Sequence, residues 1–155
     1  MKVFQIQKKI YEAICQQAEE EYPSEACGWI IEYKDGTQTY TPTENLQDKY
    51  HKLDPETYPR TSKDAFFMNT RKLEKAIEEA KEKGGRLFSI VHSHIDVGAY
   101  FSEEDKKQMS DENGPIFLAD CYLVVGVTNK KVDSNAVFYY DYEKKDFIQA
   151  ELEII

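Results

Sequence analysis

Apolar residues recur at helical spacing near the start of the chain and again in its middle. The first stripe covers residues 7–20, stops at Pro23 and consists of Ile6, Ile10, Ala13, Ile14, Gln17 and Ala18. The second stripe stops at the glycine pair 84–85 and consists of Leu73, Ala76, Ile77 and Ala80. Both stripes put their apolar residues on one side of a helix, and a glycine commonly follows a helix end. They predict two amphipathic helices.

Runs rich in apolar, β-branched and aromatic residues predict strands. These runs lie at residues 26–33, 37–40, 65–68, 86–94, 121–127, 136–140 and 147–154. Between them, the segment from about 42 to 64 is polar, contains Pro55 and Pro59 and keeps no period, so we expect a long loop. Helices and strands mix without repeated βαβ units. The order predicts an α/β fold with a mixed β-sheet flanked by helices.

The strand expected at residues 86–94 ends in two histidines. It is apolar on both faces before them, as in a central strand. Side chains on a strand alternate between faces, so His92 and His94 project from the same side and continue the face begun by Phe88 and Ile90. They lie about 6.5 to 7 Å apart along the backbone and can close on one ion.

Ser102 and Asp105 follow this strand. Ser102 precedes three acidic residues and predicts the N-cap of a short helix, with Asp105 in its first turn. Asp105 can then be the third ligand beside the two histidines. Two imidazoles and one carboxylate leave the fourth position of a tetrahedral zinc open to water, which is typical of a catalytic zinc site.

Composition narrows the choice of partners. A chain of 155 residues, 41% hydrophobic and 13% aromatic, has the size and apolar content of one domain covering residues 1–155. Its net charge of −9 argues against a protein that holds nucleic acid or anionic lipid through its overall field. A partner with a basic surface suits this charge better.

The cysteines and the apolar runs indicate a cytoplasmic protein. Cys15, Cys27 and Cys121 are odd in number and widely spaced, so they support neither a disulfide framework nor a thiolate zinc site. The first 22 residues carry charges throughout, and no stretch approaches the roughly 20 apolar residues of a membrane span. We therefore expect no membrane partner.

The spacing of the candidate ligands resembles a known motif. One residue separates His92 from His94, seven separate His94 from Ser102, and two separate Ser102 from Asp105. This is similar to the JAMM metalloproteases, also called the MPN+ or JAB domain, which add an upstream glutamate. Glu25, in the run from Pro23 to Gly28, matches it. The resemblance continues through residues 66–69, 84, 99–102 and 122–127, and implies the cytidine-deaminase-like sandwich of the JAB domain.

The resemblance also implies a role for each matching residue. His92, His94 and Asp105 would hold one zinc ion per chain. Glu25 would be the general base that accepts the proton of the attacking water and passes it to the leaving amine. The Ser102 hydroxyl would stabilise the oxyanion, besides capping its helix. The family commonly has a proline after the second histidine, where this chain has Ile95, so we expect a slightly altered geometry without loss of a ligand.

As for substrates, small prokaryotic-type members of this family hydrolyse the bond after the C-terminal Gly-Gly tail of a ubiquitin-like protein. Two bonds fit: an isopeptide link to lysine, as in deubiquitinase-like deconjugation, or a short adduct such as cysteine on a sulfur-carrier protein. Activating or conjugating enzymes of the same pathway are further expected partners. The tail would lie as an added strand at a sheet edge, and the loop at 43–64 would select the partner.

Other assignments are less well supported by the residues. Metal-dependent phosphoesterases and amidohydrolases on barrel folds need further histidines, and the chain has three in total. A non-catalytic MPN scaffold would have lost ligands that are present here. We expect His51 to be a plain surface residue, Asp96 a loop residue, and Cys27 and Trp29 core residues.

Overall fold

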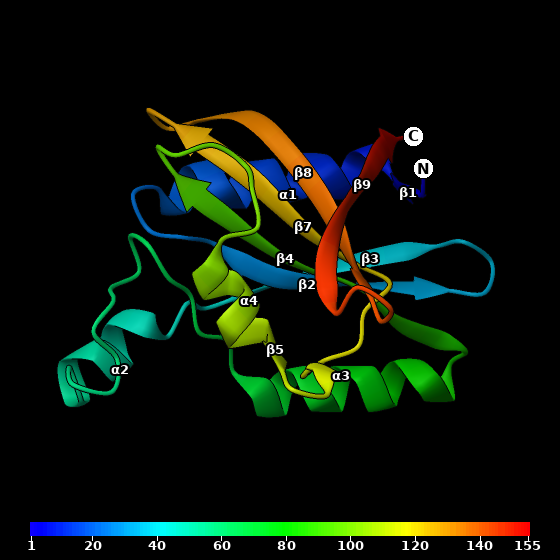
Figure 1. The fold of residues 1–155 in the computed structure, drawn as a ribbon. Coiled ribbons are helices and arrows are strands. Elements are labelled where there is room, and N and C mark those ends of the chain that lie inside the picture. Colours follow the sequence, from blue (N-terminus) through cyan, green and yellow to red (C-terminus); the bar gives the residue numbers. More distant parts are fainter.

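A computed structural model describes residues 1–155 and shows a seven-stranded mixed sheet with four helices (Figure 1). The helices are α1 (Lys8–Glu21), α2 (Gln47–Leu53), α3 (Thr70–Glu82) and α4 (Glu103–Met109). The strands are β1 (Val3–Ile6), β2 (Cys27–Tyr33), β3 (Gln38–Thr43), β4 (Gly85–Ile95), β5 (Ser110–Asp111), β6 (Gly114–Pro115), β7 (Cys121–Thr128), β8 (Lys131–Asp141) and β9 (Asp146–Ile154). The predicted α/β class and mixed sheet are confirmed.

The large sheet has the strand order β1-β9-β8-β7-β4-β2-β3, and β5 and β6 form a separate small hairpin. Two pairs, β1 with β9 and β4 with β7, are parallel. The other neighbours are antiparallel. Strand β4 lies inside the sheet between β7 and β2, which explains why its sequence is apolar on both faces.

Helices cover both faces of the sheet. On one face, the stripe of α1 packs on side chains such as Ile30, Val91 and Leu123. On the other face, α3 and α4 place Leu73 and Met109 against a cluster that contains Trp29, Ile90 and Tyr122 (Figure 1). Cys27 belongs to this second cluster, so the core role predicted for Cys27 and Trp29 is confirmed.

A bulge in β4 corrects one prediction. The pairing of β2 with β4 shifts between Ile30, opposite Ser89, and Ile31, opposite Leu87, so Phe88 has no partner in the register. Because of this extra residue, side chains two positions apart across the bulge lie on opposite faces of the sheet. Phe88 packs in the α1-side cluster, whereas Ile90 packs in the opposite one. His92 and His94 therefore continue the face of Ile90 but not that of Phe88.

The segment expected to be one long loop contains regular structure. Strand β3 runs on to Thr43, with Pro42 tolerated because β3 is an edge strand. Helix α2 follows, and it buries only Gln47, so it has no apolar stripe that a sequence pattern could reveal. It is held instead by aromatic contacts, in which Tyr50 packs against Tyr58 and Phe67.

The strand predicted at residues 65–68 is wrong. The backbone there bonds to side chains and to a loop and not to a neighbouring strand. The Asn45 side chain donates to the Ala65 carbonyl and accepts from the Phe67 amide, and the Phe67 carbonyl accepts from the Leu46 amide. The apolar run reflects burial of Phe66 and Met68.

The short strands β1, β5 and β6 were not predicted. Each has at most four residues, too few to establish a period of two. No helix of the structure has both the length and the apolar character needed to cross a membrane.

Candidate metal centre

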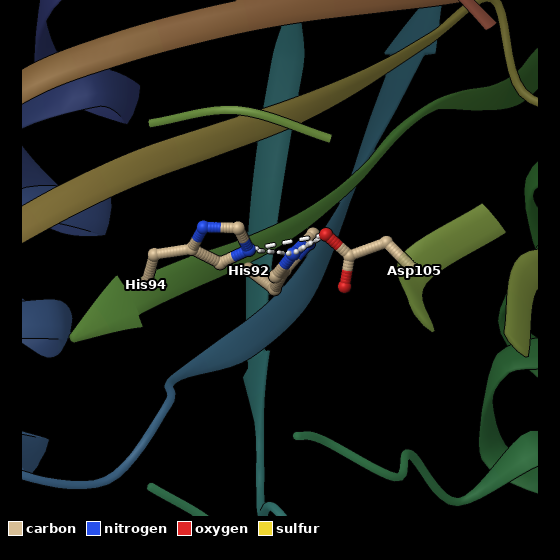
Figure 2. A group of neighbouring side chains, drawn as sticks. All are labelled: His92, His94 and Asp105. Atoms are coloured by element: carbon tan, nitrogen blue, oxygen red, sulfur yellow. Dashed lines mark hydrogen bonds and ion pairs between the residues drawn. The ribbon is translucent and has the colours of Figure 1, made fainter. Parts of the chain in front are cut away.

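The end of β4 brings the two histidines together on the face covered by α4. Their Nε2 atoms lie 3.2 Å apart, and both rings are almost fully buried. The Asp105 Oδ2 atom lies 3.1 Å from each of these nitrogens. Figure 2 shows the three side chains converging from β4 and α4. The structure thus assembles the three ligands predicted from the sequence.

A capping box at the start of α4 fixes Asp105. The Ser102 Oγ atom accepts a hydrogen bond from the Asp105 amide at 3.0 Å, and the Ser102 amide donates to Asp105 Oδ2 at 3.0 Å. Both bonds satisfy backbone or side-chain groups at the helix N-terminus. The predicted N-cap at Ser102 is confirmed, and the same motif orients the carboxylate towards the histidines.

The three donor atoms have the spacing that a small tetrahedral ion requires. With metal–ligand bonds of about 2.0 to 2.1 Å, tetrahedral donors lie about 3.3 Å apart. The triangle formed by His92 Nε2, His94 Nε2 and Asp105 Oδ2 has edges of 3.1 to 3.2 Å. These residues form a buried group able to hold a metal ion.

Neighbouring groups hold the imidazoles in this orientation. His94 Nδ1 lies 3.2 Å from the Gly98 carbonyl oxygen, which favours a proton on Nδ1 and leaves the Nε2 lone pair directed at the ion position. The His92 ring stacks on Phe66, with ring centroids 4.5 Å apart. Both contacts reduce the reorganisation needed to bind an ion.

Asp105 stays ionised inside this buried group. Burial alone would raise its pKa, but the charges and hydrogen bonds of His92 and His94 outweigh that effect and lower the pKa well below the usual range. An ionised carboxylate is the form that ligates a metal.

Glu25 lies just before β2, next to the histidines. Strand β2 pairs Cys27 with His92, and the Ala26 amide donates to Ser93 Oγ at 2.7 Å. Continuing this antiparallel pairing places Glu25 beside His94 on the same face of the sheet. The Asn45 side chain donates to the Glu25 carbonyl at 2.9 Å and fixes the backbone on the other side.

Glu25 lines a pocket that also includes one of the three metal donors. His94 and Ser102 line this pocket together with Glu25. The Glu25 side chain is buried, and its Oε1 atom has no hydrogen-bond partner. Burial, followed by the negative charge of Asp105, raises the pKa of Glu25 to about 9. A buried carboxyl with a free oxygen beside a metal-binding group is suited to proton transfer.

Two residues that contribute to the site were not predicted. Asn45 bonds four backbone groups of the surrounding loops through its amide. Arg60 lines the pocket with Glu25. Neither stands in a recognisable spacing, because both come from the polar segment between β3 and α3. The only sequence signal for them was their place in the polar loop at 43–64, which was expected to select the partner.

The remaining histidine and Asp96 lie outside the donor group. His51 is half-buried in α2, and its Nδ1 lies 2.7 Å from the Tyr58 carbonyl, so it is not the plain surface residue expected. Asp96 is in the turn after β4, as predicted, with a positive φ of 58°. It accepts hydrogen bonds from the Tyr22 hydroxyl and the Asn129 amide.

The chain is similar to several known proteins. The family model described as prokaryotic homologs of the JAB domain matches residues 7–138. A tail tip assembly protein K of Escherichia phage N15 is 32% identical over 107 residues, which are 66% of this chain and 35% of that protein. The chain therefore spans about a third of the length of this curated relative.

Three solved structures have the same fold. Protein DSY2949 from Desulfitobacterium hafniense has a TM-score of 0.70 at 22% identity, over 99% of this chain and 93% of that one. A protein from Salinibacter ruber has a TM-score of 0.58 at 18% identity, over 100% and 92%. AF2198, a JAB1/MPN domain protein from Archaeoglobus fulgidus, has a TM-score of 0.50 at 16% identity, over 99% of both chains. With the family match over most of its length, the chain belongs to the prokaryotic JAB domain family.

Proposed function

We propose that this protein is a zinc-dependent peptidase of the JAMM type. The observation that carries the proposal is the combination of a preformed His-His-Asp donor triangle with the buried Glu25 carboxyl, which has an oxygen without a hydrogen-bond partner and lines a pocket with one of the donors, His94. A non-catalytic scaffold has no use for a buried, unpartnered glutamate beside three metal ligands, because such a group costs stability.

The residues divide the chemistry between them. His92, His94 and Asp105 would hold zinc, which when bound polarises a water and a substrate carbonyl. Glu25, whose ionised form is favoured by the positive charge of a bound ion, accepts the proton of the attacking water and delivers it to the leaving amine. The Ser102 Oγ atom accepts a hydrogen bond from the Asp105 amide. The hydroxyl hydrogen of Ser102 therefore remains free to donate a hydrogen bond to the developing oxyanion.

The proposed substrate is the bond after the Gly-Gly tail of a ubiquitin-like protein. The leaving group is either a lysine in an isopeptide link or a short adduct such as cysteine on a sulfur-carrier protein. Glycines on the acyl side of the scissile bond suit a site with buried donor atoms, because a backbone without side chains approaches these atoms closely.

The match to a phage protein favours a second candidate function. The relative from Escherichia phage N15 is a tail tip assembly protein. A related role here would be cleavage of a protein during assembly of a phage tail tip. Neighbouring genes separate the two candidates: tail structural genes favour assembly, whereas genes of activating, conjugating or sulfur-transfer enzymes favour a ubiquitin-like substrate.

The decisive experiment compares Glu25→Gln and His92→Ala with the parent protein. We expect Glu25→Gln to keep one zinc per chain and a native circular dichroism spectrum, while hydrolysis of a Gly-Gly-linked substrate falls by about a hundredfold or more. His92→Ala should lose stoichiometric zinc in elemental analysis. Full activity of Glu25→Gln would remove the base role, and full zinc in His92→Ala would refute the ligand set.

A further inference from the structure

The pocket beside the metal donors carries two cations. Besides Glu25, His94 and Ser102, its lining includes Arg60 and Lys63 from the segment that follows α2. The acids Asp64, Glu103 and Glu104 also line it. In an acidic protein, two cations in the lining of the candidate active site are a feature that zinc binding and proton transfer do not use.

Arg60 is held in place but keeps its hydrogen-bond donors available. Its guanidinium lies 3.6 Å from Asp64 and 3.5 Å from Glu104. Both separations exceed the roughly 2.7 to 2.9 Å of a charge-assisted hydrogen bond. The side chain is 41% exposed, and the Arg60 carbonyl accepts a hydrogen bond from the buried Gln47 side chain. The backbone is therefore fixed, while the planar N–H groups remain open to a ligand.

A guanidinium with open donors binds a carboxylate in a bidentate manner. The two proposed leaving groups differ in this respect. When a single residue follows the Gly-Gly tail, only its α-carbon separates the α-carboxylate from the scissile nitrogen. The carboxylate must then enter the same pocket. When the tail is linked to a lysine side chain, only methylene groups lie at that distance.

We propose that Arg60 binds the free α-carboxylate of a single residue attached to the tail, so that the enzyme removes short C-terminal adducts in preference to lysine-linked proteins. The inference rests on the proposed peptidase function. Water adds to the carbonyl carbon of the last tail residue and the C–N bond breaks. The proton passes to the leaving nitrogen, and the products are a tail ending in Gly-Gly carboxylate and a free amino acid.

The test uses peptides that end in Gly-Gly followed by one residue, with either a free C-terminal carboxylate or a C-terminal amide. We expect the zinc-loaded parent protein to prefer the carboxylate form by at least about tenfold in kcat/KM, since a hydrogen bond to a charged group is lost in the amide. Arg60→Gln should remove this preference by slowing only the carboxylate form. Arg60→Lys should restore part of it, because it keeps the charge without the planar fork.

Arg71→Gln is the matched control, because Arg71 is an exposed cation on α3 outside the pocket, and it should keep the full preference. Equal hydrolysis of both peptides by the parent protein would overturn the inference but leave the peptidase function intact. A uniform loss on both peptides in Arg60→Gln would also overturn it, because Arg60 would then act on the tail or on Glu25, whose pKa its charge lowers, and not on the leaving residue. No hydrolysis of either peptide or of a lysine-linked form would refute the proposed function itself.

Discussion

The fold strongly changes the protonation of Glu25. Its carboxyl is buried, one oxygen has no partner, and the nearby Asp105 carries a negative charge. Burial and this charge raise its pKa to about 9, against about 4.3 in an unfolded chain. The folded, metal-free protein therefore keeps a proton on Glu25 over a pH range where the unfolded chain has lost it.

This difference predicts a pH-dependent stability. A raised carboxyl pKa contributes stability that is complete below the unfolded value and is lost as pH rises towards the folded value. With metal removed by a chelator, the free energy of unfolding of the parent should fall with pH relative to that of Glu25→Gln. We expect the difference to grow in favour of Glu25→Gln by up to about 1.4 kcal/mol per pH unit between pH 5.5 and 8. Urea denaturation at several pH values measures this gain. Parallel pH profiles for the two proteins would show that Glu25 is not perturbed.

Ser102 should affect stability and rate separately. Ser102→Ala removes the acceptor of the Asp105 amide, at a cost of about 1 kcal/mol in unfolding free energy. It should also slow hydrolysis by about a hundredfold. Ser102→Asp can still cap but brings negative charge towards the oxyanion, so we expect a folded and nearly inactive protein.

The control for Ser102 is the other side-chain cap of a helix. Asn69 caps α3 by accepting from the Lys72 amide, away from the donor triangle. Asn69→Ala should lose a similar free energy of unfolding and keep the parental rate. If Ser102→Ala also kept the parental rate, its hydroxyl would be only a cap.

At the scale of elements, the pairing of β4 with β7 positions His94, one of the candidate metal ligands. Gly126 on β7 pairs with His94 on β4. A Cβ atom at Gly126 would lie 3.0 Å from the Ala99 amide nitrogen and 3.0 Å from the Gly98 carbonyl carbon, and would contact Ser134 Oγ. The Gly98 carbonyl is the group that orients His94 through Nδ1. Close packing of this turn on β7 therefore supports the metal ligand.

Gly126→Ala should consequently weaken metal binding without touching a ligand. Displacing the turn releases His94 Nδ1, and loss of such an outer contact costs about tenfold or more in metal affinity. Competition with a chromogenic chelator measures the zinc dissociation constant. Gly85→Ala is a steric control at the opposite end of β4, where the new Cβ atom would meet the Tyr33 ring. Unchanged zinc affinity in Gly126→Ala would mean that the turn has no such role.

Most of the helices and strands that the sequence predicted contain apolar residues that the structure buries. Helices α1 and α3 and strands β4, β7 and β9 bury one or both faces, so the pattern and the structure agree. Helix α2 and the segment around Phe66 depend on the side chain of Asn45 and on the Tyr50–Phe67 contact, which leave no periodic trace. The grouping of the three candidate ligands was predictable because a strand and a helix cap fix their spacing locally. Arg60 was not, because its place depends on how a distant loop folds back.

At the scale of the whole molecule, the donor group packs against one of two apolar cores. Two clusters of 17 and 14 buried residues cover the two faces of the sheet, and the His92 ring stacks on Phe66 of the larger cluster. The donors sit at the end of β4 and the start of α4, at the margin of the cluster that contains Phe66. Burial of apolar surface in these clusters supplies the main driving force for folding.

We therefore expect the protein to remain folded without metal and to be stabilised by it. Chelation should leave near-ultraviolet circular dichroism and cooperative unfolding intact, unlike a zinc finger, which unfolds without its ion. Free zinc at one hundred times its dissociation constant should then add about 2.7 kcal/mol to the unfolding free energy. His92→Ala should show no zinc-dependent gain, which separates binding at the centre from binding at surface carboxylates. Loss of cooperative unfolding on chelation would instead mean that the ion, and not the two apolar clusters, holds the fold together.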